Sequence, residues 1–198
     1  MVKFEKNVSQ VLPYDREQYR AYFDEDDNTF DRSIIWHAVS LQQSAIKNEK
    51  LYQASEEIVT NCIDSLENSF KKIISKLDQG FPWIVNHDDK DLRWFNKEGD
   101  NTMPKMRGLF KQSDIPISFI GCLIFPKGDL LDFARELITY PYVLSYKNLD
   151  VSHDELPFVI KMTGHLTLDL LSTDKALLIE ILKDDTFDSF LKINYRSR

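Results

Sequence analysis

The chain has 198 residues, of which 42% are hydrophobic and 29% charged, as is typical of a globular domain. Its 13 Phe, 8 Tyr and 3 Trp argue against disorder, because disordered chains lack such aromatic anchors. The net charge of −7 disfavours binding to nucleic acid or to an anionic membrane, since both require clustered Lys and Arg.

The N-terminal segment contains several aromatic residues at helical spacing. They predict a short helix from about Asp15 to Phe23, with one aromatic face made by Tyr14, Tyr19, Tyr22 and Phe23. The N-terminus itself is charged and lacks the apolar core of a signal peptide.

The densest negative cluster of the chain follows, and it consists of Asp24, Glu25, Asp26 and Asp27. Its spacing matches the first positions of a calcium-binding loop. Thr29 and Ile35, however, stand where that loop needs Gly and a bidentate Glu. We interpret the cluster as a solvated acidic turn that can attract a basic partner.

Residues 31–78 show helical periodicity. A first apolar stripe consists of Ile34, Ile35, Ala38, Leu41 and Ala45. A second consists of Ile58, Val59, Cys62, Ile63, Leu66, Phe70, Ile73, Ile74 and Leu77. On the face opposite the second stripe, acidic residues come first and lysines last, which suits the helix dipole. Gly80 and Pro82 mark the end of this predicted helix. We predict a helical layer here, either a pair of helices or one bent helix.

Residues 81–114 combine bulky aromatic residues with turn formers. Trp83 and Trp94 are candidate partner-binding residues, because Trp is a frequent interface anchor. The stretch 96–114 contains Gly99, Pro104 and Gly108 and is expected to form a loop.

From residue 117 the pattern alternates between strands and helices. Ile117–Phe125 is apolar on both alternating faces and predicts a strand covered on both sides. A helix is expected from Asp129 to about Thr139, ended by Pro141, followed by strands at about 142–151 and 158–162.

The next connection can be constrained by strand register. A three-residue loop at 163–165 pairs Met162 with Leu166 and brings one apolar face together. One long strand bent at Gly164 keeps the same face inward and remains an alternative. In both cases the expected core residues are Phe158, Ile160, Met162, Leu166, Leu168 and Leu170.

Ser172 or Thr173 is expected to cap a helix that begins near Asp174. The predicted fold is α+β in a single domain, 1–198. A small mixed sheet of three to five strands, at about 117–171, packs against helices and is preceded by the helical region at about 31–78. Within the domain we distinguish a helical N-terminal layer (1–80), an aromatic-rich and loop segment (81–114) and an α+β core (115–198).

The sequence contains none of the common signatures for metal, phosphate or nucleophilic chemistry. No two of its four histidines lie three to five residues apart, and no Cys-x-x-Cys, glycine-rich phosphate loop or Gly-x-Ser-x-Gly occurs. Cys62 and Cys122 lie in apolar patterns and are expected to be buried free thiols, which fits a protein in the reducing cytoplasm. We expect no cofactor and no metal.

These observations favour a non-enzymatic, cytoplasmic protein-binding module. A concrete form is an immunity-type or inhibitor protein that masks a basic partner through Asp24, Glu25, Asp26, Asp27, Trp83 and Trp94. We expect neither nucleic acid nor a membrane as a partner. The sequence is compatible with a monomer and with a homo-oligomer. The alternative is a small-ligand-binding protein or enzyme with a cleft between the helical layer and the sheet, lined by His87, Asp89, Arg93, His165 and Asp169.

Overall fold

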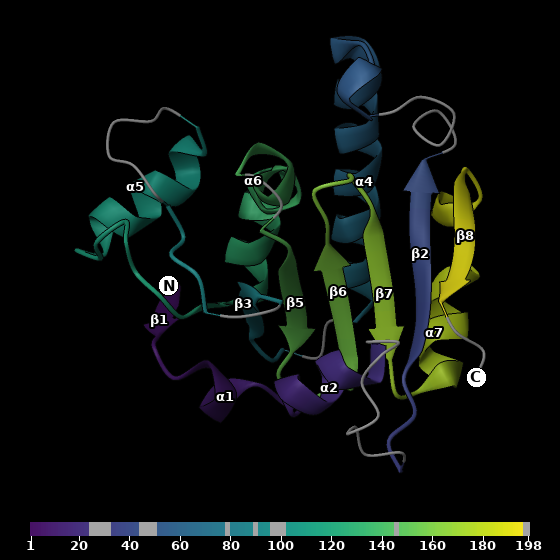
Figure 1. Ribbon diagram of the computed structural model, residues 1–198, viewed down its shortest axis with the longest axis horizontal. Coiled ribbons are helices and arrows are strands. Elements are labelled where there is room, and N and C mark those ends of the chain that lie inside the picture. The colour runs from purple at the N-terminus through teal and green to yellow at the C-terminus, as the bar shows by residue number, and fades with distance from the viewer. Residues whose placement is uncertain are drawn as a thin grey trace.

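In the computed structural model the described residues are 1–23, 33–43, 51–77, 80–88, 91–95, 102–144 and 147–195. They contain one antiparallel sheet of eight strands in the order β1-β4-β3-β5-β6-β7-β2-β8 (Figure 1). The strands are β1 (Lys3–Glu5), β2 (His37–Gln43), β3 (Trp83–His87), β4 (Cys122–Phe125), β5 (Leu149–His153), β6 (Phe158–Met162), β7 (Leu168–Ser172) and β8 (Phe190–Tyr195).

Helices cover this sheet on both sides. The α-helices are α1 (Val8–Val11), α2 (Arg16–Phe23), α4 (Glu56–Lys76), α5 (Pro104–Gln112), α6 (Lys127–Val143) and α7 (Lys175–Leu182). Two short 3-10 helices are η1 (Leu51–Gln53) and η2 (Asp185–Phe187). Figure 1 shows α4 and α6 behind the sheet, where they build the main core. On the opposite face, α1 and α2 pack against the strands through two smaller apolar clusters.

The expected small mixed sheet at 117–171 is wrong. Strands β1, β2, β3 and β8 lie outside that range, and every strand pairing is antiparallel. The helical region expected at 31–78 is correct only for its second half. There α4 begins after the cap Ser55, whose Oγ accepts a hydrogen bond from the Ile58 amide at 3.3 Å.

Residues 37–43 form a strand rather than a helix because both of their faces are covered. Val39 and Leu41 join the main core, whereas Ala38 packs under α2. The expected helical stripe joined Ala38 and Leu41, which lie on opposite faces of β2, with Ile34 and Ile35, which precede the strand.

Two further boundaries differ from expectation. The helix expected to stop at Pro141 continues to Val143, because a proline in the last turn removes only one backbone hydrogen bond. Strand β5 therefore begins at Leu149 instead of residue 142. Pro104 opens α5 inside the expected loop, at the first helical position, where the missing N–H has no intrahelical partner in any case.

The connection after β6 has five residues instead of three, because Met162 pairs with Leu168 and Ile160 with Leu170. The shift by two keeps every side chain on its expected face. The six core residues predicted for this region are all buried. The cap of α7 is Asp174, whose Oδ1 accepts from the Ala176 and Leu177 amides at 2.9 and 3.1 Å.

Gly121 sits where β1 meets β4, and we expect Gly121→Ala to destabilise the protein by about 2 kcal/mol. Its φ is +144°, and a Cβ there would lie 2.2 Å from the Glu5 carbonyl oxygen and 2.7 Å from Phe119 Cζ. Urea denaturation measures the loss. Gly108→Ala in α5 is the control, since a Cβ at Gly108 meets nothing within 4 Å. Equal unfolding midpoints for the two variants would contradict this reading of the β1–β4 contact.

Candidate functional site

One polar residue from each of five adjacent strands lies at the same level of the sheet, on the face covered by α2. The register pairs Asn86 with Asp150, Asp150 with Lys161, Lys161 with Asp169, and Asp169 with Ser40. Strand alternation sends their apolar neighbours to the main core and these five side chains to the α2 side. We call them the polar row. All except Lys161 are buried.

Hydrogen bonds satisfy one end of the polar row. Ser40 Oγ donates to Asp169 Oδ1 at 2.6 Å, and Thr167 Oγ1 donates to the same oxygen at 3.3 Å. Lys161 Nζ donates to Asp88 Oδ2 at 3.0 Å, just beyond the end of β3. Ser40, Thr167 and Asp169 are thus joined by hydrogen bonds at the β2 end of the row, whereas Lys161 forms a separate pair with Asp88 toward β3.

Asp150 is the least satisfied group of the polar row. It is 0% exposed, and among the described residues neither of its carboxylate oxygens has a hydrogen-bond partner. Its nearest cation is Lys161 Nζ, 3.9 Å from Oδ1. A buried carboxylate with so few partners is costly in its charged form.

The titration of the polar row follows from this burial. Burial raises the pKa of Asp150 from 3.8 to about 7, although Lys161 opposes the shift. Burial also raises the pKa of Asp169, despite the hydrogen bond from Ser40. Burial alone would lower the pKa of Lys161, but Asp150 and Asp88 raise it overall, so this lysine stays charged.

Three aromatic rings form a roof over the polar row. Tyr19 of α2 lies with its ring centroid 5.0 Å from that of Tyr14 and 4.9 Å from that of Trp36, and Tyr14 and Trp36 lie 5.7 Å apart. Lys161 Nζ lies 5.5 Å from the Tyr19 centroid, so the roof contacts the row through a cation–π interaction. The helix expected at about Asp15 to Phe23 is confirmed as α2.

The segment before α2 is fixed by Asp15. Its Oδ1 accepts hydrogen bonds from the amides of Glu17 and Gln18 at 2.9 and 3.0 Å, which satisfies two free N–H groups of the helix start. Arg16, the first residue of α2, pairs with Asp91 at 2.7 Å and thereby ties the helix to the chain after β3.

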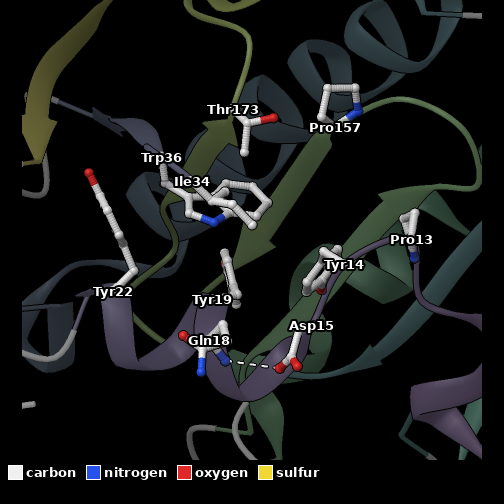
Figure 2. A pocket seen from close by; sticks show the side chains of 10 residues that line it. All are labelled: Pro13, Tyr14, Asp15, Gln18, Tyr19, Tyr22, Ile34, Trp36, Pro157 and Thr173. Atoms are coloured by element: carbon white, nitrogen blue, oxygen red, sulfur yellow. Dashed lines mark hydrogen bonds between the residues drawn. The ribbon is translucent and has the colours of Figure 1, made fainter. Parts of the chain in front are cut away.

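A pocket of about 480 Å³ opens beside the aromatic roof, and we call it the aromatic pocket. Figure 2 shows residues from α2 and the preceding segment on one side and residues flanking the strands on the other. The lining consists of Pro13, Tyr14, Asp15, Gln18, Tyr19, Tyr22, Ile34, Trp36, Pro157 and Thr173. Its volume and its lining of aromatic and apolar residues, with a few polar groups, are typical of pockets for small organic ligands.

The residues expected to bind a partner do not form a surface in the described structure. Asp24, Glu25, Asp26 and Asp27 lie outside the described residues. Trp83 and Trp94 are 0% exposed, because their indoles fill the core on the α6 side of the sheet. Trp94 Nε1 donates to the Gly121 carbonyl at 3.0 Å, so the indole N–H is hydrogen-bonded although it lies inside the core.

The residues expected to line a cleft are not brought together either. His87 is buried on the main-core face, where its Nε2 lies 3.0 Å from Tyr140 Oη and burial lowers its pKa to about 4. Arg93 and His165 are exposed, and Asp89 lies outside the described residues. Asp169 belongs to the polar row on the opposite face from His87, so the set does not converge on one site.

The described parts of the chain contain no group of three or more His, Cys, Asp or Glu side chains that could hold a metal ion. Within the same ranges, no helix is both long and apolar enough to cross a membrane. Cys62 and Cys122 are free and buried, and burial raises the pKa of each thiol to about 12. Neither thiol is therefore a reactive thiolate.

Comparison with known proteins found no match for the chain among family models, curated proteins or solved structures. The aromatic pocket and the polar row beneath it are therefore the features from which a function can be inferred.

Proposed function

We propose that this protein is a non-catalytic binding protein whose aromatic pocket receives a small organic group of its ligand. The observation that supports the proposal is the pocket of about 480 Å³ between α2 and the sheet. Its aromatic residues provide large contact areas with few rotatable bonds, so a ligand loses little of its binding energy to the ordering of side chains.

Catalysis is less well supported than binding. The carboxyl group with a pKa near neutrality, Asp150, lies beneath the roof and is absent from the residues that line the pocket. Asp15 does line the pocket, but one of its oxygens already caps α2. A general base must come within hydrogen-bond distance of the reacting atom, and Asp150 does not line the pocket where a ligand would lie.

The pocket favours the small-ligand alternative over the masking of a basic protein by an acidic surface. The cleft expected between a helical layer and the sheet has a counterpart here, although its helix is α2 and not residues 31–78. Of the residues named for surface masking, Trp83 and Trp94 are buried in the core, and Asp24–Asp27 lie outside the described residues.

The experiment is a titration followed by the Trp36 indole N–H signal in ¹H–¹⁵N NMR, assigned with Trp36→Phe. The probes are phenol, indole, methylguanidinium, choline and acetate, each added separately. We expect at least one probe to shift this signal with saturation. Thr173→Tyr, which fills the pocket from its rim, should weaken that binding at least about tenfold.

Thr60→Tyr is the matched control, because Thr60 lies on the exposed face of α4, away from the pocket. It should bind the probe as the unaltered protein does. If no probe saturates, or if both Tyr variants bind equally well, the proposed pocket function is wrong.

A further inference from the structure

We infer that the group held in the aromatic pocket is an organic cation, with a guanidinium or substituted ammonium head. The inference rests on the proposed function, because it names the chemical class of ligand for the same pocket. Two independent features support it: the ring faces of the walls and the charge distribution behind them.

The walls of the pocket are suited to a cation. Tyr14, Tyr19, Tyr22 and Trp36 all contribute rings, and Figure 2 shows them grouped around the opening beside α2. Ring faces carry a negative quadrupole, and several rings around one space form the arrangement that holds substituted ammonium groups. Lys161 Nζ lies 5.5 Å from the Tyr19 ring centroid, so a ligand cation relies on the Tyr14, Tyr22 and Trp36 rings more than on Tyr19.

The charges behind the rings are predominantly negative. Arg16 and Lys161 are each paired with a carboxylate: Arg16 with Asp91 at 2.7 Å and Lys161 with Asp88 at 3.0 Å. Three further carboxyl groups, those of Asp15, Asp150 and Asp169, belong to the pocket lining or to the row beneath it.

Asp150 acts on the rings themselves. Burial, followed by the charge of Asp150, raises the pKa of both Tyr14 and Tyr19, although Lys161 and Arg16 partly oppose the shift at Tyr14. A buried carboxylate acts through a low local dielectric, so its effect on a nearby ligand is larger than in water. An anionic ligand would be repelled, and a neutral one would gain nothing from this charge.

The test compares each cation with a neutral molecule of the same shape, using the Trp36 indole signal at pH 8. The pairs are methylguanidinium with methylurea, and choline with 3,3-dimethyl-1-butanol. We expect one cation to bind at least about tenfold more tightly than its neutral counterpart. Asp150→Asn should weaken the cation at least about threefold and leave the neutral counterpart unchanged.

The outcomes separate this inference from the proposed function. If a neutral counterpart binds as tightly as its cation, the charge assignment is wrong while the pocket remains a binding site. If Asp150→Asn weakens the cation and its counterpart equally, the carboxylate has no electrostatic role and the inference fails. If no probe binds at all, the proposed function fails as well.

Two sources can supply such a head group: a free small cation or an arginine side chain of a protein. The peptide acetyl-Gly-Arg-Gly-amide and its neutral citrulline analogue distinguish them. Tighter binding of the arginine peptide than of methylguanidinium would point to a protein ligand. Tighter binding of the free cation would point to a small molecule, and equal binding of the arginine and citrulline peptides would contradict the inference.

Discussion

Replacing Lys161 with methionine is expected to lower the free energy of unfolding by about 3–5 kcal/mol at pH 8. The substitution removes the ammonium group that bonds Asp88 at 3.0 Å and lies 3.9 Å from Asp150. Methionine preserves the length of the side chain, so the loss reports the charge and not a cavity. The carboxylates of Asp88, Asp150 and Asp169 then face one another without this cation. Urea denaturation at pH 8 measures the change.

The coupling to Asp150 makes this expectation specific. The double variant Lys161→Met with Asp150→Asn lacks one of the carboxylates that the single variant leaves unpaired. Its free energy of unfolding should therefore be at least about 1 kcal/mol higher than that of Lys161→Met. Lys192→Met is the control. Lys192 lies on the exposed edge strand β8 and pairs with Asp188, so this substitution should lower the free energy of unfolding by no more than about 0.5 kcal/mol. A loss at Lys161 no larger than at Lys192 would show that the polar row does not depend on its lysine.

Local sequence patterns predict some elements here and fail for others. The stripe from Ile58 to Leu77 is long and has one polar face, so its helix could be recognised from spacing alone. The tyrosines before residue 24 likewise predict α2. Residues 37–43 resemble a helix in spacing because Ala38 and Leu41, on opposite faces of β2, lie three residues apart.

Local sequence patterns do not predict the candidate site. Asn86, Asp150, Lys161, Asp169 and Ser40 come from five separate strands, and only the pairing register places them in one row. Each residue alone resembles the solvated position of a half-exposed strand. Asp169, Asp150 and Lys161 each stand between two apolar residues, which is a sequence signal for a polar side chain on an otherwise apolar strand. What could not be predicted is that α2 covers this face and turns solvated positions into buried ones.

Asp150→Asn is expected to change the pH dependence of stability. Because burial raises the pKa of Asp150 from 3.8 to about 7 on folding, its protonated form favours the folded state. This contribution is fully present below about pH 4 and is lost as the pH rises through about 7. Asparagine is neutral at every pH, so the difference in unfolding free energy between variant and parent should grow by about 3 kcal/mol in favour of the variant between pH 4.5 and pH 8.

Using the difference between variant and parent is essential, because other groups titrate over the same range. His87, whose pKa burial lowers to about 4, loses its contribution as the pH falls, which opposes Asp150. The charged and titratable groups that face Asp150 are Lys161 of β6, Asp88 after β3, Asp169 of β7, and Tyr14, Arg16 and Tyr19 of the α2 segment. They remain in both proteins, so their own titration largely cancels in the difference. Asp154→Asn, at an exposed aspartate after β5, is the surface control measured at the same two pH values. A flat difference for Asp150→Asn would mean that its carboxyl group titrates as if it were in water, and the buried negative charge behind the aromatic pocket would have to be abandoned.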